Sequence, residues 1–375
     1  MANIFSEGKK EREIFKNEEV LYPEYVPEIL PHRESQINEI VFALKPLAKA
    51  KKASNLFLFG PPGTGKTASI NYVIRELEEY TERAKALYIN CFDISSRHAV
   101  LSELARFFSI ALPRRGIAGD EILARILERA RTIDFRPLIV LDEIDRLGSE
   151  EASKLLYDLL RMDVKQKPSV VLISNYREFV AFLDARVRSS LAAILVEFPR
   201  YSPTELKDIL RERAKYAFYE NCIEQDAINL AAAFAAKHGG DARIAIELLL
   251  HAGRIAEAKN KEKLTAEDVK EATKKIVVVP LDRIVANLNE AEKIILKIIA
   301  KKQPIISGEL FESFLEEAKD KEIAKSERSY RNMIARLSAL KLINAEETNL
   351  KTRGKTRRIS LAVNKEELLS RLDNK

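Results

Sequence analysis

Gly60-Pro61-Pro62-Gly63-Thr64-Gly65-Lys66-Thr67 decides the fold, because it matches the Walker A pattern G-x-x-x-x-G-K-[ST]. A short apolar run at 56–59 precedes it, and a helix-like segment follows it. This strand–loop–helix order predicts a tight loop whose backbone N–H groups point at phosphate oxygens. Lys66 is expected to reach the β- and γ-phosphates, and the Thr67 hydroxyl to ligate Mg²⁺. The sequence therefore predicts binding of a nucleoside triphosphate. The predicted nucleotide contacts are Gly60, Pro61, Pro62, Gly63, Thr64, Gly65, Lys66, Thr67 and Ala68.

Polar residues follow two further apolar runs, at 138–141 and 169–174. Asp142 is placed to hold the Mg²⁺ shell, and Glu143 to orient and activate the attacking water. Asn175 could hydrogen-bond the γ-phosphate or the water, although an isolated Asn is by default a turn residue. Apolar strands that alternate with helices predict a parallel sheet covered on both faces, whose ligands bind at the carboxyl ends of the strands. All these polar residues lie at predicted strand ends, so the assignments agree.

Composition sets the broad class. A chain of 375 residues is expected to form two or three domains. Its net charge of +6 mildly favours a polyanionic partner, although a basic enzyme without such a partner would look the same. Cys91 and Cys222 form no C-x-x-C pair, so no disulfide framework or zinc site is indicated. There is no apolar signal core and no run of membrane-spanning length, so we expect a cytoplasmic protein with no membrane partner.

The regions flanking the predicted sheet have different patterns. Residues 1–20 are polar and predict a loose arm or a short helix. Prolines then hold the segment 21–34 extended, which could form the wall of a base pocket or only pack on the domain. After Tyr201 the strand pattern stops, and 201–276 is predicted to be helical, with a break at Gly239-Gly240. Arg243 opens the helix after this break, either as one half of a solvated salt bridge or as a sensor of γ-phosphate.

A third pattern begins at Pro280. Helices are predicted after Asn289, Ser307 and Ser326, and strands at 342–343 and 359–363. The hairpin tip at 351–358 has five basic residues and no acid. Three helices and a basic hairpin describe a winged helix-turn-helix, whose third helix enters a DNA major groove. A basic tip is also compatible with a solvated loop, but its pairing with a basic third helix favours DNA contact. The predicted DNA contacts are Arg328, Arg331, Asn332, Lys351, Arg353, Gly354, Lys355 and Arg357.

Together these patterns predict an α/β P-loop domain with a parallel sheet covered by helices, an α-helical region that we call the lid, and a C-terminal winged helix-turn-helix domain. The nucleotide-binding base with its N-terminal arm is placed at 1–200. The helical lid is placed at 201–279, and the winged-helix domain at 280–375.

Further motifs accompany the phosphate loop, and each is short. They are Tyr25-Val26-Pro27-Glu28, Pro31-His32-Arg33-Glu34, Leu141-Asp142-Glu143-Ile144-Asp145, Asn175, Leu183-Asp184-Ala185-Arg186-Val187-Arg188-Ser189-Ser190-Leu191, Phe198-Pro199-Arg200-Tyr201 and Gly240-Asp241-Ala242-Arg243. With them, the chain from Tyr25 to Val363 resembles the archaeal origin-recognition and helicase-loader ATPases of the AAA+ class. The phosphate loop alone would be generic, whereas the combination with the leading Val-Pro-Glu and His-Arg-Glu segments is much more specific.

The resemblance implies roles for individual residues. Asn175 takes the sensor-one role and Arg243 the sensor-two role. Arg186 matches the arginine that reaches the nucleotide of a neighbouring subunit, with Arg188 as the alternative. The adenine pocket would be walled by Val26, Pro27, His32 and Arg33. The region 94–116 corresponds to an insertion that touches DNA in these initiators, with Arg114 and Arg115 as its candidate contacts. Gly354 is the only glycine at the tip, unlike a glycine-rich wing.

The function that the resemblance implies is that of a DNA replication initiator, which binds origin DNA and helps load the replicative helicase. It would be a slow ATPase that binds ATP/ADP and Mg²⁺ and acts as a nucleotide switch. The protein would be cytoplasmic and associated with the nucleoid. Its partners would be double-stranded origin DNA, the replicative helicase, and identical or paralogous initiator subunits. Two other classes stay open: a signalling or transposition-helper ATPase whose winged helix docks protein, and a processive DNA motor.

Overall fold

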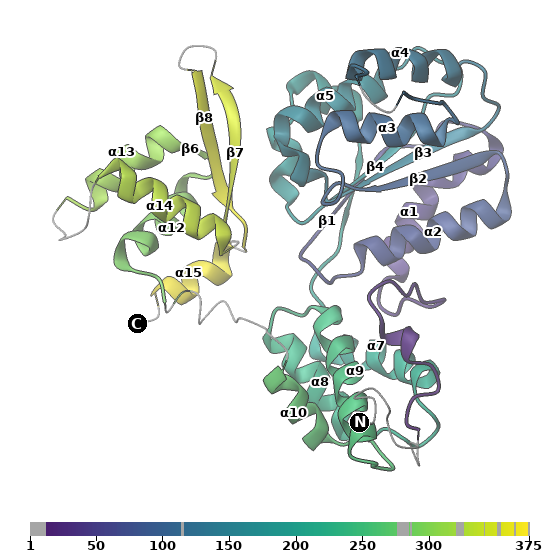
Figure 1. Cartoon of the computed structure of the whole chain (residues 1–375), viewed down its shortest axis with the longest axis vertical. Helices are drawn as coiled ribbons and strands as arrows, with labels where there is room; N and C mark the ends of the chain where they lie inside the picture. The colour runs from purple at the N-terminus through teal and green to yellow at the C-terminus, as the bar shows by residue number, and fades with distance from the viewer. Residues whose placement is uncertain are drawn as a thin grey trace, which may run out of the picture. The chain divides into compact units, whose positions relative to one another are not determined.

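The computed structural model describes residues 13–113, 116–275, 285, 287–319, 326–340, 342–350, 354–363 and 365–373. The chain divides into two compact units, Met1–Val277 and Val278–Lys375 (Figure 1). The first unit contains an α/β base and a helical lid, and the second is a winged helix, which confirms the predicted fold class. None of the helices among these residues combines the length and apolar character needed to cross a bilayer.

A parallel sheet forms the centre of the first unit. In the described part of the chain its five strands have the order β2 (Ala84–Asn90), β3 (Arg136–Asp142), β4 (Ser169–Ser174), β1 (Leu56–Phe59) and β5 (Ile194–Glu197). Strand β5, at the edge of the sheet, had not been expected from the sequence. Its apolar run is short and continues directly from the end of the preceding helix, so no turn signal separates the two.

Helices cover both faces of this sheet (Figure 1). One face packs against α1 (Glu34–Leu44) and α2 (Lys66–Tyr80). The opposite face packs against α3 (Arg97–Phe107), α4 (Gly119–Ala130), α5 (Gly148–Leu160) and α6 (Ala185–Leu191). Strand β1 shows the consequence, since Leu56 and Leu58 enter one core, while Phe57 and Phe59 enter the other. Four short 3-10 segments are described between the larger elements: η1 (Glu18–Leu21), η2 (Lys45–Lys49), η3 (Ile144–Leu147) and η4 (Arg177–Phe182).

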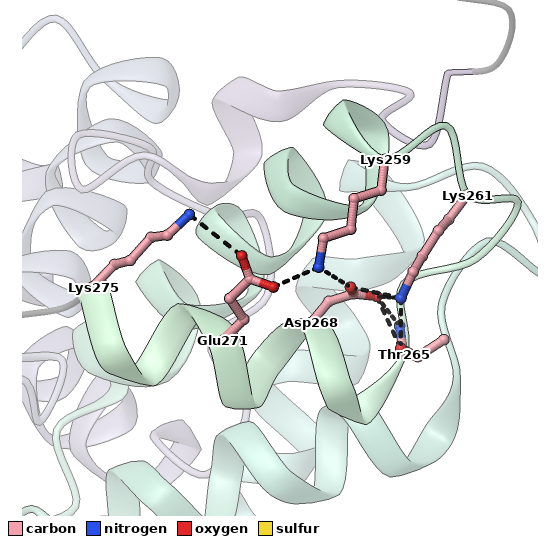
Figure 2. Close-up of polar contacts among 6 residues, drawn as sticks. All are labelled: Lys259, Lys261, Thr265, Asp268, Glu271 and Lys275. Carbon is pink, nitrogen blue, oxygen red and sulfur yellow. Dashed lines mark hydrogen bonds and ion pairs between the residues drawn. The ribbon is translucent and has the colours of Figure 1, made fainter.

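The lid consists of α7 (Pro203–Ala217), α8 (Gln225–Lys237), α9 (Ala242–Ala258) and α10 (Ala266–Lys275). A reciprocal capping box between Ser202 and Glu205 begins α7. The link from α9 to α10 is fixed by Asp268, which is fully buried (Figure 2). Its carboxylate accepts hydrogen bonds from Lys261 Nζ at 2.7 and 2.9 Å and from the Thr265 backbone and hydroxyl at 3.0 and 2.9 Å. Because a buried charge is costly without partners, this cluster holds the two helices in one arrangement.

The described part of the N-terminal arm packs on the lid and contains the short 3-10 helix η1, so of the two expectations, a loose arm or a short helix, the second agrees with the structure. Ile14 is buried, and its N–H donates to the carboxylate of Glu257 at 2.9 Å. The Phe15 ring stacks on Phe218 at a centroid distance of 5.0 Å. Gly253 makes room for this ring, since a Cβ there would lie 2.3 Å from Phe15 Cζ. Because the arm is mostly polar, its composition did not indicate that Ile14 and Phe15 would pack on the lid.

The second unit has the predicted helices and hairpin. They are α12 (Glu290–Lys302), α13 (Ser307–Glu317), α14 (Glu327–Ala339), β7 (Ile343–Leu350) and β8 (Gly354–Leu361). A capping box between Asn289 and Glu292 begins α12, the helix predicted after Asn289. Two short elements had not been expected, β6 (Ile305–Ile306), which pairs with β8, and α15 (Lys365–Asp373). The hairpin pairs from Ile343 opposite Leu361 to Leu350 opposite Gly354. Residues 354–358, which were predicted to be part of the hairpin tip, therefore belong to strand β8.

Candidate functional site: a phosphate loop, its acidic strand end and the lid

The phosphate loop connects β1 to α2 and requires its glycines. Gly60, Gly63 and Gly65 have φ values of 147°, 70° and 89°, a region that side chains other than glycine rarely adopt. A Cβ on Gly60 would also lie 2.2 Å from the Phe198 carbonyl oxygen. Glycine at these three positions therefore allows the backbone to turn tightly around a small anion.

Lys66 lies at the first position of α2 and is almost buried. Its Nζ donates to the carbonyl oxygens of Gly60 at 2.6 Å and Pro61 at 2.8 Å, and to Asn175 Oδ1 at 3.0 Å. Burial lowers the pKa of Lys66 to about 8. The predicted phosphate ligand and the predicted sensor are thus in direct contact, across the neighbouring strands β1 and β4.

Asp142 ends β3 and faces the phosphate loop. Its Oδ2 accepts hydrogen bonds from the Thr67 hydroxyl at 2.6 Å and the Tyr88 hydroxyl at 2.7 Å. Burial, with the Asp142 charge beside it, raises the pKa of Tyr88, so this phenol stays a donor. The hydroxyl and carboxylate oxygens fit Mg²⁺, which prefers oxygen ligands. In the described part of the chain, no group of three His, Cys, Asp or Glu residues could hold a metal, so the ion would need further oxygens, such as those of phosphates.

Glu143 and Asp145 leave the same strand end in different directions. Glu143 has a φ of 49°, unusual for a side-chain-bearing residue, and its carboxylate lies 3.4 Å from Arg146 Nε. Asp145 accepts the Ser174 hydroxyl at 2.7 Å, and burial raises its pKa. Asp145 thereby ties the end of β3 to the end of β4, immediately before Asn175.

Arg33 comes from the proline-rich segment and is 1% exposed. Its guanidinium donates at 2.7 Å to each of three carbonyl oxygens, those of His32, Thr64 and Pro199. It also stacks over the Tyr201 ring at 3.8 Å. Burial lowers the pKa of Arg33. The residue predicted to wall the adenine pocket therefore joins the phosphate loop to the chain that leads into the lid.

The lid reaches the phosphate loop at the start of α9. The Ala242 N–H donates to the Gly63 carbonyl oxygen at 3.2 Å. Asp241 caps α9, and a Cβ on Gly63 would lie 1.7 Å from its Oδ1. Arg243 forms an ion pair with Asp241 at 2.8 Å, and this pairing raises the pKa of Arg243. The positive charge of Arg243 also contributes to the lowered pKa of Lys66, so the two cations lie in one site.

In the second unit, α14 buries one face and exposes the other. Tyr330, Ile334 and Leu337 recur at helical spacing and are buried. Arg328, Arg331 and Asn332 are exposed. Arg331 pairs with Glu327 one turn earlier at 2.6 Å, and both side chains are more than half exposed.

Comparison with known proteins matches the whole of this architecture. Three family models cover successive parts of the chain: an AAA domain at 49–183, the Cdc6 AAA+ ATPase-type lid domain at 207–274, and the CDC6 C terminal winged helix domain at 285–371. ORC1-type DNA replication protein 1 of Sulfurisphaera tokodaii is 37% identical over 374 residues, which covers 96% of this chain and 94% of that protein. The chain belongs to the family of ORC1-type DNA replication proteins.

Other ORC1-type proteins and solved structures agree. The ORC1-type DNA replication protein of Thermococcus kodakarensis is 35% identical over 381 residues, covering 97% of this chain and 92% of that protein. The structure of the Aeropyrum pernix ORC1 protein in complex with DNA has a TM-score of 0.69 and 32% identity, covering 96% of this chain and 97% of that one. The Aeropyrum pernix ORC2 protein, in ADPNP-ADP complexes, shares the fold at 22% identity, with a TM-score of 0.67 over 96% of this chain and 98% of that one.

Other predicted site residues of this ORC1-type chain lie apart from these contacts or outside the description. Arg186 is 70% exposed and pairs with Asp184 at 3.2 Å, while Arg188 donates to the Ala181 carbonyl oxygen at 2.7 Å. Val26 and His32 are half-buried, and Pro27 is buried. Arg357 is exposed on β8. Outside the described residues lie Arg114, Arg115, Lys351 and Arg353, as do the side chain of Lys355 and the surroundings of Gly354.

Tyr88 and Asp241 are site residues that the sequence analysis did not select. Each bonds a residue that it did select, Asp142 and Arg243 respectively. A usable signal existed for both. Tyr88 lies two residues before the end of β2, in register beside Val140 of β3. Asp241 directly precedes the start of α9, the helix that carries Arg243, a predicted phosphate ligand.

Proposed function

We propose that this chain is an ATP-controlled replication initiator, which binds origin DNA and helps recruit the replicative helicase. The observation that carries the proposal is that one chain contains both features. The first unit has a phosphate loop beside polar strand ends, and the second unit is a winged helix with exposed hydrogen-bond donors on α14. The DNA complex of the Aeropyrum pernix ORC1 protein, similar over 96% of this chain, supports the DNA partner. Membership in the ORC1-type family supports the role in replication.

In this proposal, nucleotide binding replaces hydrogen bonds within the protein by contacts to the phosphates and the metal ion. Lys66 would leave carbonyl oxygens of its own loop and donate to the phosphates. The Thr67 hydroxyl would turn from Asp142 to the ion, while Asp142 keeps the hydrogen bond from Tyr88. Mg²⁺ would supply neutralisation of phosphate charge. Glu143 would orient the attacking water and accept its proton, and Asn175 and Arg243 would sense the γ-phosphate. Val26, Pro27, His32 and Arg33 would wall the adenine pocket.

Slow turnover by an isolated protomer follows if Arg186 acts on a neighbour's nucleotide. Its guanidinium is exposed, and its partners among the described residues are Asp184 and the Tyr157 ring at 5.8 Å. An arginine supplied from another subunit is worth a rate factor on the order of 10³–10⁵ in related phosphoryl-transfer systems. A lone protomer would lack that factor and act as a switch.

Mixing two inactive variants tests the trans role. In a mixture of Arg186→Ala and Glu143→Gln proteins, sites with an intact Glu143 can face a neighbour with an intact Arg186. Turnover above that of either variant alone is expected. No recovery in mixtures shown to assemble would contradict the role of Arg186, and the same test with Arg188→Ala identifies the alternative.

The DNA part of the proposal rests on α14 and the hairpin. Arg331 and Asn332 carry donors suited to base edges, whereas Arg357 lies on the wing, where contacts go to phosphates. Mapping of the protein along its own genome tests the initiator function. A few discrete sites near replication start points are expected. Binding spread along all DNA, with ATP turnover strongly stimulated by any duplex, would instead indicate a motor. A protein that binds no duplex would indicate that the winged helix docks protein.

A further inference from the structure

The tripeptide Asp-Ala-Arg occurs twice, at 184–186 and 241–243, and each time it starts a helix. In both places the Asp side chain caps the helix by accepting the N–H of the Arg two residues later, at 2.8 Å for Arg186 and 2.9 Å for Arg243. The same carboxylate binds the guanidinium of that Arg through two nitrogens. We refer to these two arrangements as Asp-Ala-Arg caps.

We propose that Asp241 is a positioning residue, which withholds Arg243 from phosphate and so sets the affinity of the site for nucleotide. The inference rests on the proposed function, in which Arg243 contacts the γ-phosphate. The same bonds recur at Arg186, the second arginine for which phosphate is the proposed target. The chain therefore uses one local device at both of these arginines.

The geometry makes the carboxylate a competitor of phosphate. Arg243 donates from Nε to Asp241 Oδ1 at 3.2 Å and from a terminal nitrogen to Oδ2 at 2.8 Å. These two nitrogens form one of the guanidinium edges that can bind phosphate in a bidentate manner. Phosphate can take this edge only after the carboxylate has released it. The free energy of that exchange is subtracted from the free energy of nucleotide binding.

The surroundings distinguish this cap from a helix cap on an open surface. The Asp241 side chain is 17% exposed and touches the phosphate loop at Gly63, while the Arg243 side chain is 61% exposed. A negative charge therefore lies against the loop that is proposed to hold phosphate. The adjacent Ala242 N–H donates to the same Gly63, which holds the cap in place. Loss of the Asp241 charge is thus expected to favour phosphate both directly and through Arg243.

Asp241→Asn separates the charge of this residue from its role as a cap. Asn caps helices about as well as Asp, so α9 is expected to keep its start and the lid its melting temperature. Asn cannot form the ion pair with Arg243. We expect ATP to bind about two- to tenfold more tightly, which is the range of one partly exposed ion pair plus the removed repulsion. The gain is expected to be larger for ATP than for ADP, which has no γ-phosphate.

The experiment is calorimetric titration of the full chain with Mg-ATP and Mg-ADP. It compares the wild type, Asp241→Asn, Arg243→Ala and the double variant. Asp226→Asn is the matched control, because Asp226 is an exposed acid in the first turn of α8 on the same lid. The nucleotide affinity of this variant is expected to equal that of the wild type. The gain from Asp241→Asn is expected to shrink by at least half when Arg243 is absent.

The outcomes are distinct. Unchanged or weaker ATP binding by a folded Asp241→Asn protein would overturn the inference. A gain of equal size in the Arg243→Ala background would also overturn it, because the charge would then act on the loop without the arginine. A wild type that binds neither nucleotide would contradict the proposed function itself. Tighter ATP binding that depends on Arg243 supports the inference.

Discussion

The nucleotide site and the exposed face of α14 both consist of polar side chains, but the two regions hold them in opposite ways. Lys66 is 7% exposed and has three acceptors within 3.0 Å. Arg331 is 75% exposed, and its ion pair is with Glu327 on its own helix. The positions in the first region are therefore set by the tertiary fold. Those in the second are set only by the helix backbone.

This difference predicts how each region responds to change. A preorganised site loses little entropy when its ligand arrives, so a lost group costs its full interaction. Exposed side chains must be ordered by the DNA, which reduces what each contact contributes. The comparison therefore predicts large effects in the first unit and smaller ones in the second.

The largest effect is expected for Glu143→Gln. Loss of the carboxylate removes the proposed proton acceptor, and turnover is expected to fall by a factor of about 10²–10⁴. ATP binding is expected to persist, because Glu143 would act on the water and not on the ground-state ligand. Steady-state ATPase rates and a binding titration on the same preparation measure both. Turnover at the wild-type rate would contradict the assigned role.

A smaller loss is expected for Lys66→Ala, which removes a charged donor to phosphate. We expect ATP affinity to fall about ten- to hundredfold. Lys154→Ala is the matched control, since Lys154 carries the same charge but lies exposed on α5, paired with Glu150. DNA binding is expected to survive in part, because it is assigned to the second unit. A loss of DNA binding equal to that of ATP binding would contradict the proposal that the first unit binds nucleotide and the second unit binds DNA.

Much of the nucleotide site could be predicted from the sequence because its local conformations demand particular residues. Gly60, Gly63 and Gly65 have positive φ values, and Asp142 ends a strand whose position the apolar run marks. The contact between Lys66 and Asn175 could also be anticipated, since parallel strands bring their carboxyl ends to one edge of the sheet.

Long-range partners could not be predicted in the same way. Arg33 binds the carbonyl oxygens of Thr64 and Pro199, and a backbone acceptor leaves no trace in the sequence. The anchoring of Ile14 by Glu257 joins residues 243 positions apart, which no periodicity encodes. On α14 the limit is different, since the buried face follows from its spacing, but the proposed DNA contacts of its exposed side chains depend on another molecule.

On that exposed face, Asn332→Ala is expected to weaken binding to the preferred duplex by about 1–3 kcal/mol. A base contact carries sequence information, so binding to random duplexes is expected to change much less. Competition titrations with both kinds of duplex give the two values. Equal losses on both would mean that Asn332 contacts the DNA backbone.

The smallest effect is expected for Arg357→Ala on the wing. Arg357 is exposed on β8, near the hairpin end and opposite Glu347 in the pairing register. If it neutralises one phosphate, its loss is expected to reduce the slope of log affinity against log salt by roughly 0.9. Affinity at moderate salt is then expected to fall only a few-fold, and equally for preferred and random duplexes.

Arg131→Ala is the control for this measurement, because it removes the same charge from an exposed position next to α4 in the first unit. Its salt slope is expected to match that of the wild type. A loss confined to the preferred duplex would place Arg357 on a base edge. The wing would then contribute to sequence recognition. The proposed difference between α14, which reads bases, and the wing, which binds phosphates, would be wrong.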